Sequence, residues 1–154
     1  MTAHEDRGDR RPDRRDEGLG PVPAAYRRHP AVRWQTWKMK ALEAITNLHT
    51  DDVERAREFF GLLGLREDGM NQGWVARFTS ADSGACVQVV TRDATAPEDS
   101  VMTIKVDDVD GAYQEAQQRG YVIVHPITDE PWGIRRFFVR SPDGDVINVA
   151  QHRS

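Results

Sequence analysis

Two amide side chains and two tryptophans are the residues of this sequence whose types best suit ligand binding. Gln88 and Asn148 each stand between aliphatic strand formers, in Val-Gln-Val and Ile-Asn-Val. An amide offers both a donor and an acceptor, so it can orient a polar ligand. Trp74 and Trp132 can stack on planar rings or on a cation. These residues predict a lined cleft for a small molecule.

Residues that could catalyse a reaction are fewer. Cys86 is the only cysteine, which excludes an internal disulfide and a cysteine-based zinc site. It alternates onto the same strand face as Gln88, but a lone buried cysteine is more often a small hydrophobe than a nucleophile. Glu43 could be a general base, an anchor for a cationic ligand, or a residue at the solvent edge. No recognisable catalytic set is formed.

The elements that must position these residues are clearest near the C-terminal end. Phe137, Phe138 and Val139 are strand formers, Ser141–Gly144 has turn chemistry, and a second strand resumes at Val146. Pro142 fixes φ and Gly144 permits positive φ, so the turn should set the register of the two strands. The sequence predicts a hairpin that carries Asn148.

The same pattern of elements occurs twice. Ile45 to Val53 aligns with Val101 to Val109 at a constant offset, and Gly64 aligns with Gly120 without a gap. Further along, Gly84 and Gln88 match Gly144 and Asn148. We therefore predict one β-α-β-β-β unit that is used twice. A single unit would leave one face of its sheet uncovered, so the two units must pair.

The last quarter of the chain closely resembles the C-terminal signature of the vicinal oxygen chelate superfamily, the glyoxalase, bleomycin-resistance and extradiol dioxygenase group. The matching residues are Pro131-Trp132-Gly133-Ile134-Arg135, Phe137-Phe138-Val139-Arg140, Pro142-Asp143-Gly144 and Asn148, with Ser141 where the family usually has Asp. The resemblance covers roughly residues 41–151. It implies an α+β fold, with two modules forming an eight-stranded curved mixed sheet around a cleft and helices on the outer face. It also implies a homodimer.

Metal-using members of this superfamily bind a divalent ion through four inward side chains. The matching positions here are Ile45, Gln88, Val101 and Asn148. Two are aliphatic and two are neutral amides, whereas zinc, nickel or iron needs at least three N, O or S donors. We therefore expect no metal and no cofactor. A displaced site that uses Glu43, His49 or a partner chain is the alternative, while His125 and His152 are expected to be solvated or at the edge of the core.

Length and composition predict one domain of 39–154, with modules at about 41–92 and 99–152, preceded by a disordered extension over 1–38. The extension holds nine of the 21 Lys and Arg and six of the 25 Asp and Glu. Its net charge is about +3 and that of the remainder about −7. The mixed signs disfavour a nucleic-acid-binding arm. No apolar run has membrane-spanning length, so a cytoplasmic location is expected.

The sequence thus favours a metal-independent protein that binds a small molecule, similar to the bleomycin-resistance members. Sequestration of an antibiotic is one role that fits this interpretation. The ligand is expected to be aromatic or cationic. Neither a nucleic acid nor a membrane is expected as a partner of the protein. Alternatives are a metal-dependent lyase, isomerase or dioxygenase, and a scaffold with a vestigial cleft. The expected ligand-binding residues are Glu43, Asn47, Trp74, Gln88, Trp132, Arg135, Phe138 and Asn148. Arg136 and Lys105 are further candidates for the mouth of the cleft.

Overall fold

The computed structural model describes residues 39–153, apart from the side chains of Met70 and Asn71. The predicted extension over 1–38 lies outside these residues. The first module contains β1 (Ala41–His49), α1 (Val53–Leu62), β2 (Arg66–Asn71), β3 (Val75–Thr79) and β4 (Cys86–Val90). The second contains β5 (Met102–Val106), α2 (Val109–Gln118), β6 (Ile123–Glu130), β7 (Ile134–Arg140) and β8 (Val146–His152). The predicted repeat of one β-α-β-β-β unit is confirmed.

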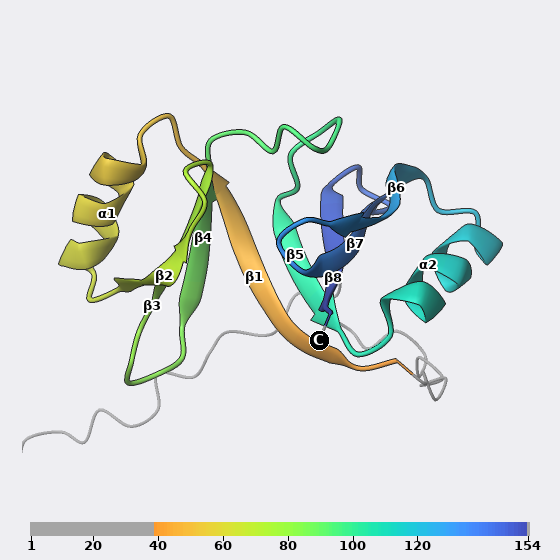
Figure 1. Cartoon of the computed structure of the whole chain (residues 1–154), viewed down its shortest axis with the longest axis horizontal. Coiled ribbons are helices and arrows are strands. Elements are labelled where there is room, and N and C mark those ends of the chain that lie inside the picture. Colours follow the sequence, from red (N-terminus) through yellow and green to blue (C-terminus); the bar gives the residue numbers. More distant parts are fainter. Residues whose placement is uncertain (1–38, 154) are drawn as a thin grey trace, which may run out of the picture. The chain divides into compact units, whose positions relative to one another are not determined.

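All eight strands form one curved sheet in the order β2-β3-β4-β1-β5-β8-β7-β6. The modules meet where β1 pairs antiparallel with β5, and within each module the first and last strands pair in parallel. Figure 1 shows β1 at the centre of the sheet, with α1 and α2 at its two ends. This arrangement confirms the predicted α+β fold with a mixed eight-stranded sheet.

Each helix begins at an aspartate that the repeat places at the same position. Asp52 accepts hydrogen bonds from the backbone N–H groups of Glu54 and Arg55, and Asp108 accepts one from that of Gly111. These bonds satisfy backbone donors that have no partner inside the helix. Both helices therefore start where an aspartate cap precedes a valine.

The apolar core lies between the helices and the outer face of the sheet. Under α1, Phe60 stacks on Phe78 with ring centroids 5.4 Å apart. Under α2, Tyr113 meets the edge of Phe137 at 5.1 Å. The outer-face residues of the strands alternate with inner-face residues, because successive side chains point to opposite sides. The inner face carries both polar and apolar side chains.

The predicted C-terminal hairpin is confirmed and fixes the position of Asn148. Gly144 has φ of 99° in the turn, and its N–H donates to the Ser141 carbonyl at 3.0 Å. Phe138 pairs with Asn148, and Arg136 pairs with Ala150. This register places Arg136 and Asn148 on the inner face of the sheet.

Within residues 39–153, neither helix has the length and apolar character needed to span a membrane.

Candidate functional site

A hydrogen-bonded row of polar side chains forms the floor of the inner face. Asn47 Nδ2 donates to Thr103 Oγ1 at 3.0 Å, and Gln88 Nε2 donates to Asn47 Oδ1 at 3.0 Å. Asn148 Nδ2 donates to the same Thr103 oxygen at 3.1 Å. These four residues come from β1, β4, β5 and β8, and none is more than 8% exposed. The floor is a polar network shared by both modules.

One atom of this network has no partner. Asn148 Oδ1 is buried and accepts no hydrogen bond. An unsatisfied buried acceptor costs about 1–3 kcal/mol. A ligand that donates a hydrogen bond to this oxygen would remove that cost.

The two predicted tryptophans meet at one end of the floor. Trp74 precedes β3 and Trp132 lies in the turn between β6 and β7, so each module contributes one ring. The ring centroids are 5.9 Å apart with an edge-on angle of 62°. Such a pair offers an aromatic wall to a planar ligand.

Behind Trp132, Arg136 forms a buried ion network. Its guanidinium donates to Asp93 at 2.7 Å and to Glu130 at 2.7 Å, and all three side chains are at most 6% exposed. It also lies over the Trp132 ring at 5.3 Å. Burial alone would raise the pKa of Asp93, but hydrogen bonds from Arg136 and Thr95 outweigh it and lower that pKa.

A second group of charges lies at the opposite end of the floor. Lys105 Nζ is 2.7 Å from Glu43, and Arg77 is 3.7 Å from Glu43 and 3.9 Å from Asp68. Burial raises the pKa of Glu43, yet its hydrogen bond with Lys105 and the charge of Arg77 lower it overall. Arg77 Nε is buried without a hydrogen-bond partner. This end therefore presents a guanidinium that is held by charge alone.

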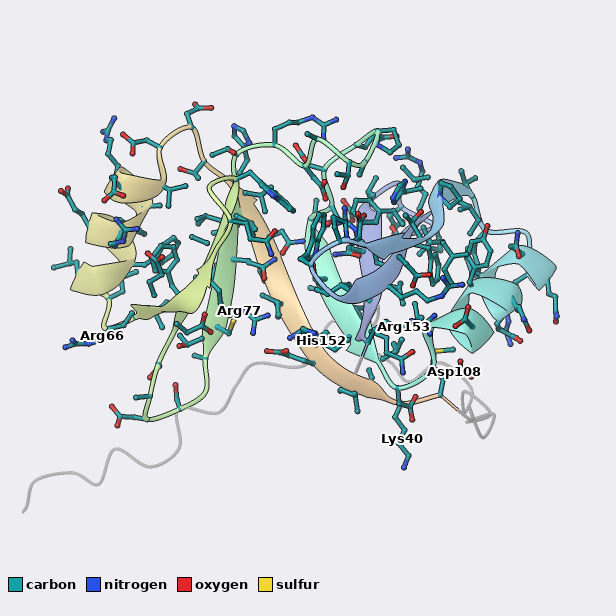
Figure 2. All side chains as sticks on the ribbon, viewed as in Figure 1. Lys40, Arg66, Arg77, Asp108, His152 and Arg153 are labelled. Carbon is teal, nitrogen blue, oxygen red and sulfur yellow. The ribbon has the colours of Figure 1, made fainter. Side chains whose placement is uncertain are left out.

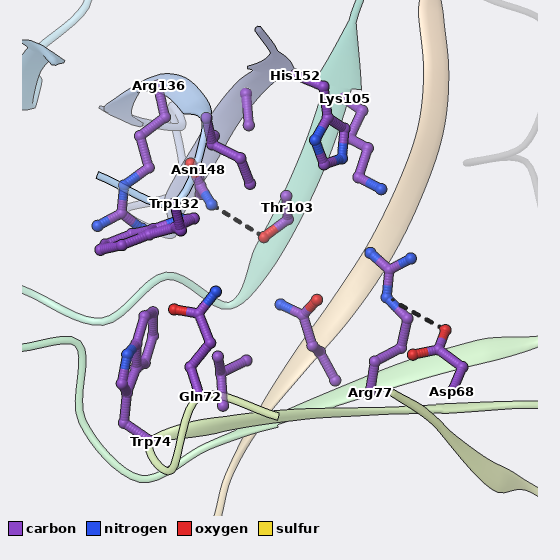
Figure 3. Close-up of a pocket in the computed structure, with 14 residues that line it drawn as sticks. Asp68, Gln72, Trp74, Arg77, Thr103, Lys105, Trp132, Arg136, Asn148 and His152 are labelled. Atoms are coloured by element: carbon purple, nitrogen blue, oxygen red, sulfur yellow. Dashed lines mark hydrogen bonds and ion pairs between the residues drawn. The ribbon is translucent and has the colours of Figure 1, made fainter. Parts of the chain in front are cut away.

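These parts line one cavity of about 330 Å³. Figure 3 shows the tryptophans and Arg136 at one end, Asn148 and Thr103 in the middle, and Arg77, Asp68, Lys105 and His152 at the other end. Figure 2 shows that Arg77 and His152 come from different modules. Asn47 lines a water-sized polar hollow of about 30 Å³ that shares Trp74, Gln88 and Asn148 with the cavity.

The residues predicted for ligand binding fall into three groups. Those that line the cavity or its small hollow are Asn47, Trp74, Gln88, Trp132 and Asn148. Glu43 lies beside the cavity, paired with Lys105. Arg135 and Phe138 do not line it.

Arg135 lies on the outer face of β7, where it binds Asp110 of α2 and Asp129 at 2.7–3.0 Å. Phe138 is 1% exposed and packs with Ala96 and Val146. The alternation along β7 therefore brings Arg136 to the cavity in place of Arg135.

The four positions that carry metal ligands in relatives do not fit a metal here. Ile45 is fully buried and aliphatic. Val101 contributes its backbone, which accepts from Asn47 N at 2.8 Å and donates to Val146 O at 2.9 Å. Gln88 and Asn148 are neutral amides whose N–H groups are already engaged in the floor. No group of three or more His, Cys, Asp or Glu side chains within 39–153 is arranged to hold a metal ion.

Of the residues named for a displaced site, His49 does not line the cavity. His49 Nε2 pairs with Asp51 at 3.0 Å, and its side chain is 65% exposed. It lines a different hollow, next to α1. Burial raises the pKa of the Cys86 thiol, which disfavours the nucleophilic thiolate form.

Several residues of the site were not identified from the sequence. Thr103, Asp93, Glu130 and Asp68 come from four separate segments that meet only in the folded sheet. Thr103 could have been found, because the repeat aligns it with Asn47. The acidic residues carry no local sequence signal.

Fold and cavity together define an α+β protein of two paired modules that enclose a cleft of small-molecule size. The sequence profile of the Glyoxalase/Bleomycin resistance protein/Dioxygenase superfamily matches residues 43–149. The chain belongs to this superfamily. No curated protein gives a sequence match.

Solved structures share the fold at low sequence identity. An NAD-dependent benzaldehyde dehydrogenase from Legionella pneumophila is 16% identical with a TM-score of 0.60, over 72% of this chain and 100% of that chain. A superfamily member from Vibrio splendidus 12B01 is 18% identical with a TM-score of 0.53, over 71% and 97%. The Mn(II)-bound glyoxalase from Novosphingobium aromaticivorans is 21% identical with a TM-score of 0.53, over 73% and 40%. At these identities the likeness concerns the fold alone.

Proposed function

We propose that this chain is a metal-independent small-molecule binding protein whose cavity takes a compact aromatic molecule. The observation that carries the proposal is the floor itself: amides and a hydroxyl, bonded to one another, lie where relatives hold a cation. Neutral amide donors do not balance a divalent charge. Within the floor, the buried Asn148 Oδ1 accepts no hydrogen bond, which supports a site for a hydrogen-bond donor of a ligand.

The aromatic wall supports a planar ligand. Trp74 and Trp132 come from different modules and are each partly exposed toward the cavity. The cavity volume is near the lower end of the range for ligand pockets, which favours a compact molecule. We propose sequestration of such a molecule, including an aromatic antibiotic, as the biological role.

A thermal-shift screen of the full chain tests this function. Planar aromatic acids, planar cationic antibiotics and dicarbonyl adducts form the panel. A true ligand at about 100 times its Kd should stabilise the protein by about 2.7 kcal/mol. Trp132→Ala should weaken binding of the best compound at least tenfold, whereas Tyr121→Ala, an exposed aromatic outside this cavity, should leave it unchanged.

The result that would contradict this function is also defined. Tightly held, stoichiometric Ni, Zn, Fe or Mn in the purified protein would favour the second candidate, a metal-dependent lyase, isomerase or dioxygenase. Failure of every compound to shift the melting temperature would favour a scaffold with a vestigial cleft.

We also propose that the chain pairs with a second copy of itself. Large apolar side chains are exposed on β1 and on α1, including Leu42 at 66% and Leu62 at 83%. An apolar surface of this kind is typical of protein interfaces. The wide hollow between α2 and the outer face of the sheet, lined mostly by apolar residues, adds to it.

A further inference from the structure

Two residues that line the same cavity each carry a buried, unsatisfied polar atom, one a donor and the other an acceptor. Asn148 Oδ1 is a buried acceptor and Arg77 Nε is a buried donor, and neither has a hydrogen-bond partner. The third unsatisfied atom among the described residues, His125 Nε2, does not line this cavity. Buried polar groups in folded proteins are almost always paired. Two open atoms in one hollow therefore indicate the groups that a ligand brings.

Arg77 is arranged to bind a planar pair of oxygens. Its nearest carboxylates, at 3.7 Å and 3.9 Å, are farther than hydrogen-bonding distance. The guanidinium is thus held by ion pairs with Glu43 and Asp68, while its Nε–H donates no hydrogen bond. A carboxylate matches this fork with two parallel hydrogen bonds.

Cations outnumber acids among the side chains that line the cavity. Its lining includes the cations Arg77, Lys105 and Arg136 and one acid, Asp68. Arg136 is neutralised by Asp93 and Glu130 at the tryptophan end. At the opposite end, Lys105 is paired with Glu43 at 2.7 Å, whereas the carboxylates nearest to Arg77 lie at 3.7 Å and 3.9 Å. Arg77 is therefore the cation of this lining that is least tightly paired with an acid of the protein.

The spacing of the two atoms suggests the length of the ligand. Arg77 is on β3 and Asn148 is on β8, with β4, β1 and β5 between them. Four strand spacings amount to about 19 Å between backbones in a flat sheet. Because both side chains extend from the curved sheet into the same cavity, this spacing is an upper limit on the length of the ligand.

We infer that the ligand is a planar aromatic acid with a hydroxyl or N–H donor at the end opposite its carboxylate. The ring lies against Trp74 and Trp132, the donor bonds to Asn148 Oδ1, and the carboxylate binds the Arg77 guanidinium. This inference rests on the proposed binding function and names its ligand class. It replaces the cationic ligand that the overall acidic charge suggested.

The test is calorimetric titration of the full chain with four matched naphthalenes. The first carries a hydroxyl and a carboxylate on opposite rings. The second lacks the hydroxyl, the third lacks the carboxylate, and the fourth has a methylammonium in place of the carboxylate. We expect the hydroxynaphthoate to bind tightest, loss of either group to weaken binding about tenfold, and the methylammonium compound to bind weakest.

Protein variants assign each effect to its residue. Arg77→Met should abolish the advantage of the carboxylate, and Asn148→Leu should abolish the advantage of the hydroxyl. Arg135→Met makes the same change in charge on the outer face and should leave all four affinities unchanged. Circular dichroism verifies that each variant is folded. If Arg77→Met is unfolded, Arg77→Lys replaces it, because lysine keeps the charge but cannot form two parallel hydrogen bonds to a carboxylate.

The outcomes separate this inference from the proposed function. Equal or tighter binding of the methylammonium compound, or a carboxylate advantage that persists in both Arg77 variants, overturns the aromatic acid while binding itself stands. Absence of binding by all four compounds also overturns it, whereas the proposed function is judged on the broader panel and on Trp132→Ala.

Discussion

Arg136 is a buried cation held by two acids from different elements. Asp93 lies in the segment between the modules and Glu130 is the last residue of β6, so the network ties this segment to the second module. Thr95 accepts a further hydrogen bond from Arg136 at 2.6 Å. The network also supports Trp132, because the guanidinium lies over its ring. The aromatic wall of the cavity thus depends on this ion network.

Replacement of Arg136 by Met should lower the free energy of unfolding by about 3–5 kcal/mol, because Asp93 and Glu130 would be left buried without a cation. Urea denaturation followed by circular dichroism measures this loss. Arg135→Met on the partly exposed outer face should cost less than about 1 kcal/mol. Similar small losses in both variants would show that the buried network contributes little.

The lowered pKa of Asp93 predicts a dependence of stability on pH. Its pKa in the folded protein is below the ordinary value of 3.8, so the unfolded chain takes up the proton first as pH falls. The stabilisation is complete above about pH 5 and is lost progressively as pH falls through 3.8 and then through the folded pKa. The slope of unfolding free energy against pH should be shallower in Asp93→Asn than in the native chain. Asp143→Asn, in the exposed turn, should keep the native slope; an unchanged slope in Asp93→Asn would contradict the assignment.

The sequence predicted the cavity residues whose face follows from simple alternation, such as Gln88 and Asn148. It named Arg135 among the expected ligand-binding residues and Arg136 only as a further candidate, because a shift of one residue in a strand reverses the face. Asp93 and Glu130 could not be predicted as partners of Arg136, since their contact depends on how the segment between the modules folds over β7. Burial of a charge is decided by such distant contacts.

The hairpin of β7 and β8 positions Asn148, Ala150 and His152 along one wall of the cavity. Its register is set by the turn at Ser141–Gly144. Gly144 has φ of 99°, a conformation that residues with a Cβ rarely adopt. No heavy atom outside its immediate chain neighbours lies within 4 Å of the position where a Cβ would be added, so only the backbone conformation opposes a side chain there.

Gly144→Ala should therefore destabilise the protein by about 1–2 kcal/mol. Gly61→Ala is the matched variant, because Gly61 lies inside α1 with equally open space. There alanine should stabilise the protein by about 0.5–1 kcal/mol. Chemical denaturation of both variants measures the difference in sign; destabilisation of equal size at both positions would contradict this explanation of the turn.

The helices, strands and turns could largely be predicted from the sequence. The repeat, the two helices and the last hairpin were all predicted, because periodicity and turn residues are local signals. How far the sheet curves, and so which side chains meet across it, has no comparable local signal.

The two modules share one sheet through β1 and β5, so every part of the cavity floor needs both of them. Their outer surfaces differ from this polar interior. Leu42 and Leu48 are exposed on β1, and Phe59 and Leu62 are exposed on α1. Such a surface is costly in water unless it is covered.

We expect sedimentation equilibrium to find a dimer at micromolar concentrations. Leu42→Glu with Leu62→Glu should shift it to monomer, since charged side chains at the centre of an interface oppose association. Glu58→Gln, which alters an exposed polar residue of α1, serves as the control. A native chain that stays monomeric throughout would refute pairing through this surface.

The most direct test of the central claim is calorimetric titration of the hydroxynaphthoate into protein stripped with a chelator, repeated after addition of Mn²⁺, Ni²⁺ or Zn²⁺. The hydrogen-bonded floor of Asn47, Gln88, Thr103 and Asn148 predicts the same Kd in every case. Binding that appears only after a stoichiometric metal ion has been added would contradict it.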